Sequence, residues 1–192
     1  MKEEKNFELK LREFAKVLNG RRTIEIFSQK SVPKSLIDEA IKVAIWAPNH
    51  HVTEPWHFYN LGKVTKEKCL DLCYEIVNKK KGKKAADFKR KSWSEKPGWL
   101  VVTCKKSTNE LLQLEDYAAC CSAIQNLILY LWKAGIGSKW TSGVITRDPE
   151  LHKIIGIDFE EEFIVGLIWY GYPKIIPTQS RKKLIDVMSN CP

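Results

Sequence analysis

The sequence predicts an α+β fold organised as one domain over residues 1–192. Strand-like apolar runs and helix-like apolar repeats are interspersed without the regular alternation of a parallel α/β fold. Two mainly apolar runs, 99–104 and 162–171, have the pattern of strands covered on both faces. A chain of 192 residues with 44% hydrophobic residues and no linker or internal repeat has room for one core.

Apolar spacing predicts three helices and one short strand in the N-terminal part of the chain. The expected ranges are 7–18, 33–47 and 66–77 for the helices and 56–61 for the strand. Gly20 ends the first helix, and Pro33 lies early in the second. Pro48 stops that second helix because the residue before a proline is pushed out of the helical region. A polar loop over 49–55 then leads into the strand.

The C-terminal part adds the two apolar strands, an extended segment and two helices. The expected ranges are 99–104 and 162–171 for the strands, 137–145 for a segment bent at Gly143, and 110–133 and about 148–156 for the helices. In the helix over 110–133, apolar residues recur every three or four positions over a length of about 36 Å. Its small residues are Ala118, Ala119, Ser122 and Ala123. They predict close packing on a large surface, such as a second copy of the chain.

The charge balance predicts an affinity for anions. The chain has 32 basic and 23 acidic residues, which gives a net charge of +9. Much of the excess lies at 79–84 and 89–91, which we interpret as a solvated loop or helix face. A basic nucleic-acid-binding module is the alternative, although no RNP, zinc-finger or helix-turn-helix pattern accompanies the lysines.

Neither a membrane segment nor a metal site is predicted. The longest uncharged apolar stretch, 124–132, is far shorter than the roughly 20 residues that cross a bilayer. The N-terminus starts charged, without an apolar segment or cleavage site, so we expect a cytoplasmic protein with six reduced cysteines. The cysteine spacings are not those of zinc sites. We interpret His50, His51 and His57 as polar loop residues rather than metal ligands.

Three segments carry residue types that suit a planar, phosphorylated ligand. Arg21, Arg22 and Thr23 lie between two predicted helices and offer guanidinium groups and a hydroxyl to a phosphate. The segment 47–58 presents amide and imidazole groups from a polar loop. The segment 140–143 places small residues where backbone amides can approach a ring. Neither GxxxxGK[ST] nor GxGxxG is present, so a P-loop or Rossmann enzyme is not predicted.

With these segments in this order, the chain resembles the nitroreductase family of FMN-dependent oxidoreductases, especially its short members. The blocks that carry the resemblance are RRTIEIF at 21–27, APNHHVTEPWHF at 47–58, GIGSKWTSG at 135–143, FIVGLIWYGYP at 163–173 and SRKKLIDVM at 180–188. The resemblance implies a central mixed sheet flanked by helices, with the long helix in a homodimer interface. It also implies two FMN molecules between the subunits and ping-pong electron transfer from NAD(P)H to nitroaromatic, quinone or similar flat acceptors.

The resemblance further implies which residues bind FMN and that no side chain is catalytic, because the flavin N5 carries the chemistry. The implied residues are Arg21, Arg22 and Thr23 in the first block, Asn49, His50 and Glu54 in a loop that reaches the flavin of the other subunit, Thr141, Ser142 and Gly143 beside the ring, and Arg181 at the phosphate.

Two positions depart from the family pattern. Glu25 stands where many relatives have Lys or Arg near the flavin N1 and O2, and Glu54 replaces the usual Gln before Pro55. A carboxylate near N1 and O2 disfavours the anionic reduced flavin, so both departures bear on the redox potential. A reductive dehalogenase or a flavin-consuming enzyme on the same fold is the alternative function. The sequence leaves open NADH against NADPH and the physiological acceptor.

Overall fold

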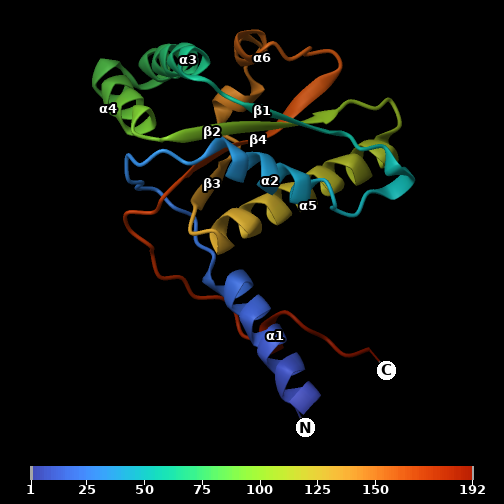
Figure 1. Ribbon diagram of the computed structural model, residues 1–192. Helices are drawn as coiled ribbons and strands as arrows, with labels where there is room; N and C mark the ends of the chain where they lie inside the picture. The colour runs from blue at the N-terminus through green and yellow to red at the C-terminus, as the bar shows by residue number, and fades with distance from the viewer. Residues whose placement is uncertain (1, 192) are drawn as a thin grey trace.

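A computed structural model describes residues 2–191 and confirms the α+β class (Figure 1). The helices are α1 (Lys2–Gly20), α2 (Lys34–Ala44), α3 (Lys63–Lys81), α4 (Lys83–Ser94), α5 (Glu110–Lys133) and α6 (Pro149–Ile155). The strands are β1 (Trp56–Asn60), β2 (Gly98–Lys105), β3 (Gly137–Thr141) and β4 (Glu162–Gly171). Three short 3-10 helices are η1 (His50–Val52), η2 (Val144–Arg147) and η3 (Leu184–Asp186). Within the described range, no helix combines the length and the apolar character that a bilayer crossing requires.

The four strands form one sheet in the order β1-β2-β4-β3, and every neighbouring pair is antiparallel. This corrects the expectation of a mixed sheet. The segment that follows α1 makes isolated bridges instead of a further strand, parallel at Thr23–Ser138 and antiparallel at Phe27–Pro173. The parallel contribution is therefore a single bridge at the outer side of β3.

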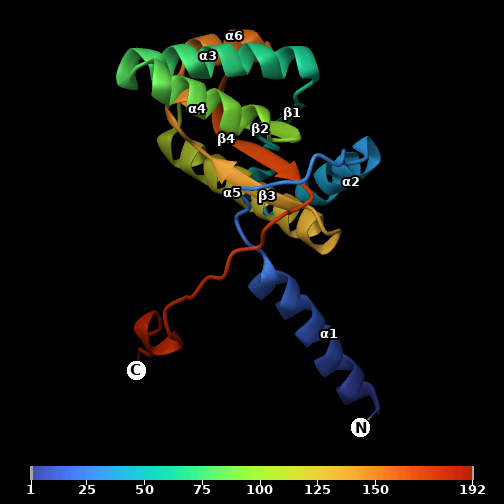
Figure 2. The ribbon, with the colours of Figure 1, turned by 90° about the vertical axis from the view of Figure 1, so that its left-hand side faces the viewer.

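The sheet is the middle of three layers, with α2 and α5 on one face and α3, α4 and α6 on the other (Figures 1 and 2). The central strands β2 and β4 are buried on both faces, as their apolar runs predict. Alternate residues of β2 serve the two layers: Leu100 and Val102 pack with α5, whereas Trp99 and Val101 pack with α3 and α4.

Two features of the fold were not predicted from the sequence, namely the helix α4 and the exposure of α1. The lysine-rich stretch is helical: α3 continues to Lys81, Gly82 turns the chain at φ 81°, and α4 follows at once. The apolar side chains of α1 are not covered, with Phe14 62% and Leu18 42% exposed. Figure 1 shows α1 projecting away from the three layers. An apolar helix face left open in this way is typical of an interaction surface.

Candidate functional site

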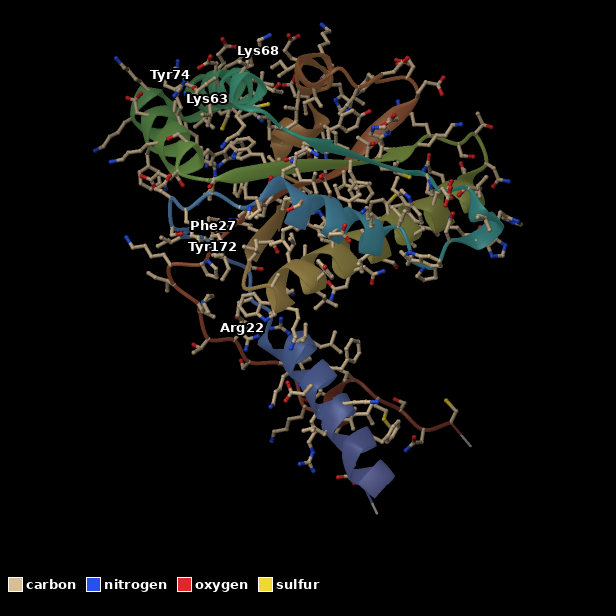
Figure 3. The ribbon with its side chains drawn as sticks, in the orientation of Figure 1. Arg22, Phe27, Lys63, Lys68, Tyr74 and Tyr172 are labelled. Atoms are coloured by element: carbon tan, nitrogen blue, oxygen red, sulfur yellow. The ribbon has the colours of Figure 1, made fainter. Side chains whose placement is uncertain are left out.

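Arginine side chains from both ends of the chain meet where α1 joins the layered body. Arg21 and Arg22 directly follow α1, and Arg181 belongs to the C-terminal tail; Figure 3 shows Arg22 at this junction. With Thr23, Glu25, Pro177 and Gln179 they line a pocket of about 290 Å³, which we name the arginine pocket. The structure thus brings together four of the residues that the sequence assigns to a phosphate.

Backbone pairing with β3 holds the first block in place. The Ile24 N–H donates to the Ser138 carbonyl over 3.0 Å, next to the Thr23–Ser138 bridge. The Ile24 side chain is fully buried, and a Cβ at Gly137 would come within 2.4 Å of it. Gly137 is therefore required for the close approach that fixes Arg21 beside the strand.

The electrostatics of the arginine pocket favour an anion. Burial lowers the pKa of the Arg21 guanidinium, and the nearby charges of Arg181 and Arg22 lower it further. Among residues 7–191, no carboxylate forms an ion pair with Arg21 or Arg181. Arg22 instead donates to the carbonyls of Asn19 and Arg21, at 2.6 and 2.9 Å. An oxyanion between Arg21 and Arg181 would relieve their repulsion, so these residues fit the phosphate of FMN.

Glu25 has a cationic partner that the sequence did not reveal. Its carboxylate accepts a hydrogen bond from Lys139 Nζ, and its carbonyl accepts one from Lys96 Nζ. Lys139 lies on β3, and its Nζ is also 5.5 Å from the centre of the Trp169 ring. A cation from position 139 therefore lies next to the carboxylate at position 25. In the sequence, the only trace of this partner of Glu25 was Lys139 itself, inside the block at 135–143.

The segment after β3 lines two different cavities. Thr141 and Gly143 border a cavity of about 260 Å³ together with Lys139. Ser142 borders another, of about 370 Å³, together with the buried His152. Since Glu25 lines the arginine pocket and Lys139 lines the first cavity, the Glu25–Lys139 pair connects the phosphate end of the candidate site to Thr141 and Gly143.

The loop over 49–54 has a strained backbone held by its own polar groups. Three of its residues have left-handed backbones, namely His51, Val52 and Glu54 with φ of 60°, 51° and 46°. The Asn49 Oδ1 accepts from the Glu54 N–H at 2.6 Å, and the Asn49 amide donates to Thr53 at 3.0 Å. Thr53 in turn donates to the buried Asp116 of α5. Such an over-determined strain is characteristic of ligand-binding segments.

Asn49, His50 and Glu54 do not join the other predicted residues within one chain. Their loop precedes β1 and contacts Asp116, whereas Gly20 approaches Trp132 at the opposite end of α5. Sixteen residues of helix separate Asp116 from Trp132, about 24 Å. In addition, β1 and β3 are opposite edges of the sheet.

The histidines are rearranged relative to the sequence-based cluster. His50 and His51 pack edge to face at 3.9 Å, and their ring nitrogens lie with a Glu115 oxygen inside 4.8 Å. His57 stands apart on β1, 4.5 Å from the Tyr59 ring. His50 and His51 are exposed and Glu115 is half-buried, an arrangement common at protein surfaces, so we assign no metal to it.

Known proteins resemble this chain in sequence and in fold. Residues 18–172 match the Nitroreductase family model. "Putative NAD(P)H nitroreductase YfhC" of Bacillus subtilis (strain 168) is 34% identical over 170 residues, which span 86% of this chain and 87% of the relative. The crystal structure of a nitroreductase-like family protein from Bacillus cereus has a TM-score of 0.81 at 30% identity, covering 93% and 95% of the two chains. A nitroreductase with bound FMN from Bacteroides fragilis NCTC 9343 has a TM-score of 0.75 at 19% identity, covering 94% and 99%. With its family match, its relatives and its fold in agreement, the chain belongs to the nitroreductase family.

Proposed function

We propose that this protein is an FMN-dependent oxidoreductase that takes hydride from NAD(P)H and reduces flat small molecules, such as nitroaromatics and quinones, by a ping-pong mechanism. The observation that carries the proposal is the arginine pocket, which Arg21 and Arg181 line together and in which the charge of Arg181 acts on Arg21. The FMN of the Bacteroides fragilis relative and the NAD(P)H in the name of the Bacillus subtilis relative support it.

In this proposal, FMN supplies the redox chemistry, because its N5 accepts a hydride and later returns two electrons to an acceptor. Arg21 and Arg181 hold the phosphate through charge-assisted hydrogen bonds. The backbone around Thr141 and Gly143 would hold the flavin ring. The Glu25–Lys139 pair adds a compensated charge between these two ends.

We further propose that the working unit is a homodimer with two flavin sites. The loop over 49–54 lies too far from the arginine pocket to serve the same site, so it completes the site of the partner. Exposed apolar side chains gather on the three helices that a partner would cover. They are Phe7, Leu11, Phe14 and Leu18 of α1, Ile45 and Trp46 after α2, and Leu111, Leu114 and Tyr117 of α5. Exposed apolar side chains that share helix faces are typical of an interaction surface.

The first experiment is purification followed by an absorbance spectrum, heat release of the bound flavin and anaerobic reduction by NADH and by NADPH separately. We expect one FMN per subunit and bleaching by at least one nicotinamide. A colourless protein that does not take up added FMN contradicts the proposal.

The alternative reaction is reductive dehalogenation, and the same preparation tests it. The reduced protein is mixed anaerobically with a nitroaromatic, a quinone or a halophenol, and flavin reoxidation is followed. We expect reoxidation by the first two acceptors without halide release from the third. Halide release as the fastest of the three reactions would establish the alternative.

A further inference from the structure

The lysine-rich stretch borders a cavity beside the candidate flavin site. This cavity, of about 260 Å³, lies between α3, α4, β3 and η2, on the sheet face that Figure 2 shows covered by α3 and α4. The lysines that line it are Lys80 and Lys81 of α3, Lys89 of α4 and Lys139 of β3. The indole rings of Trp93 and Trp169 also line it, together with Thr141 and Gly143. We name it the lysine-rimmed cavity.

The charge of this cavity is one-sided. Its lining contains four lysines and no carboxylate. Lys139 is paired with Glu25, and Lys89 Nζ stands 5.2 Å from the centre of the Trp93 ring. Lys80 and Lys81 are exposed at the end of α3 and form no ion pair with another described residue. Three cationic groups therefore remain available to a ligand at the mouth.

The turn between α3 and α4 explains why only some lysines face this mouth. Gly82 has a positive φ of 81° and reverses the chain, so α4 runs back along α3. Lys89 of α4 therefore borders the same cavity as Lys80 and Lys81 of α3. Lys83 and Lys84 begin α4 beyond that turn and are not part of the lining. Residues 79–84 are all exposed, as the solvated helix face predicted from the sequence requires, and Lys80 and Lys81 in addition border the cavity.

The walls of the cavity suit an aromatic ring with a polar group. Trp93 and Trp169 are 6% and 3% exposed and provide flat apolar surfaces. The indole Nε1 of Trp169 is buried and has no hydrogen-bond partner among residues 7–191, so this indole contributes its ring and not its N–H to the lining. A volume of about 260 Å³ lies just below the range of about 300–1,000 Å³ for drug-sized ligands. A molecule of one or two rings fits this volume better than a whole dinucleotide.

We propose that the lysine-rimmed cavity binds the electron acceptor, and that the preferred acceptor is a flat aromatic molecule bearing a carboxylate. The ring lies against the tryptophans beside Thr141 and Gly143, and the carboxylate faces Lys80, Lys81 and Lys89. The inference rests on the proposed function, because an acceptor must lie next to the FMN that reduces it. It assigns to these lysines the selection of the acceptor, separate from the retention of FMN.

The test compares 4-nitrobenzoate with its neutral analogue 4-nitrobenzamide by isothermal titration calorimetry on the purified protein as isolated. We expect the wild type to bind the carboxylate about tenfold more tightly than the amide. K80Q/K81Q/K89Q should bring the two affinities within about twofold of each other and leave the affinity for FMN unchanged. The matched control K83Q/K84Q removes charge from the same helical hairpin without touching the lining, and it should keep the tenfold preference.

Three results would overturn the inference. They are equal wild-type affinities for the two ligands, an equal loss of preference in K83Q/K84Q, or a K80Q/K81Q/K89Q variant in which KM rises more for NAD(P)H than for 4-nitrobenzoate. The calorimetry needs no turnover, so its outcome is separable from that of the proposed function. A protein without FMN that still prefers 4-nitrobenzoate through these lysines supports the site and contradicts the flavin proposal. A yellow protein that NAD(P)H reduces but that lacks this preference supports the flavin proposal and contradicts the acceptor site.

Discussion

The arginine pocket and the loop over 49–54 carry residues predicted for one ligand, yet they are built in opposite ways. The pocket gathers positive charge, and its first block is anchored by backbone pairing with β3 and by the buried Ile24. The loop has little charge but a strained backbone, and it is anchored to α5 through Thr53 and Asp116. The difference indicates a division of labour in which one half supplies binding charge and the other supplies a preshaped surface.

The strain of the loop has a cost that its polar contacts offset. Each non-glycine residue in a sparsely populated backbone region costs about 1–3 kcal/mol, and the loop contains three. The bonds of Asn49 to Glu54 and Thr53 compensate part of this cost. A loop that kept this conformation without a ligand or a partner would lower the stability of the fold without any gain in binding, so the strained loop favours a site shared by two chains.

The largest effect is expected from separating the two chains. Ala118 is exposed on α5, and Ala118→Arg places a long cation where close helix packing is predicted. We expect a monomer by light scattering and loss of bound FMN, because neither half of the site then meets the other. The matched control is Asn78→Arg on the exposed face of α3, which should stay dimeric and yellow. A monomeric Ala118→Arg protein that retains FMN would falsify the shared site.

A mixed dimer tests the division of labour directly. One subunit carries Arg21→Ala and the other carries Asn49→Ala, and each homodimer should bind FMN poorly. In the mixed dimer, one site combines both defects while the other combines an intact pocket with an intact loop. We therefore expect one FMN per mixed dimer, measured by flavin absorbance after tandem-tag purification. If each site were built within one chain, the mixed dimer would bind no more FMN than the two homodimers.

The pocket alone should respond to removal of single charges. Arg21→Ala and Arg181→Ala each delete a charge-assisted bond worth roughly 1.5–3 kcal/mol, so FMN affinity should fall about ten- to a hundredfold. Quenching of FMN fluorescence on titration measures this. Arg12→Ala removes a guanidinium from the exposed face of α1 and should change little, since it forms only a surface pair with Glu8. Wild-type affinity in both pocket variants would refute the assignment.

The elements that the sequence predicted well are those whose own residues determine them. The bounds of α5 and β4 match the predicted ranges 110–133 and 162–171, because an uninterrupted apolar pattern defines each one. By contrast, α4 has only Ala86 and Trp93 fully buried, too few apolar positions to show a helical period. Its helix depends on packing against α3, which no local pattern contains.

The candidate site divides in the same way. Arg21 and Arg181 were predicted from their blocks, and they do lie in one pocket. The pairing of Glu25 with Lys139 joins residues 114 positions apart, and neither residue type identifies the other. The left-handed backbone at Val52 was equally hidden, since a positive φ is rare for a β-branched residue. Contacts across long sequence separations and strain imposed by tertiary bonds are what a single sequence does not show.

The smallest expected effect concerns the Glu25–Lys139 pair, whose opposite charges should shift the flavin reduction potential in opposite directions. If the pair lies near the flavin N1 and O2, Glu25→Gln leaves Lys139 unopposed, stabilises the anionic reduced flavin and raises the two-electron potential. Lys139→Gln leaves the carboxylate unopposed and lowers it. Each shift should be about 30 mV, equivalent to about 1.4 kcal/mol, because Glu25 is 59% exposed and solvent screens its charge.

Equilibrium titration against reference dyes measures these potentials. The double variant Glu25→Gln/Lys139→Gln removes both charges and should return to within about 10 mV of the wild type, less than half of either single shift. Shifts of the same sign in both single variants would indicate a structural disturbance instead of a charge effect. With opposite shifts that cancel in the double variant, the cation of relatives has moved from position 25 to β3, and the carboxylate of Glu25 limits how strongly it stabilises the reduced flavin.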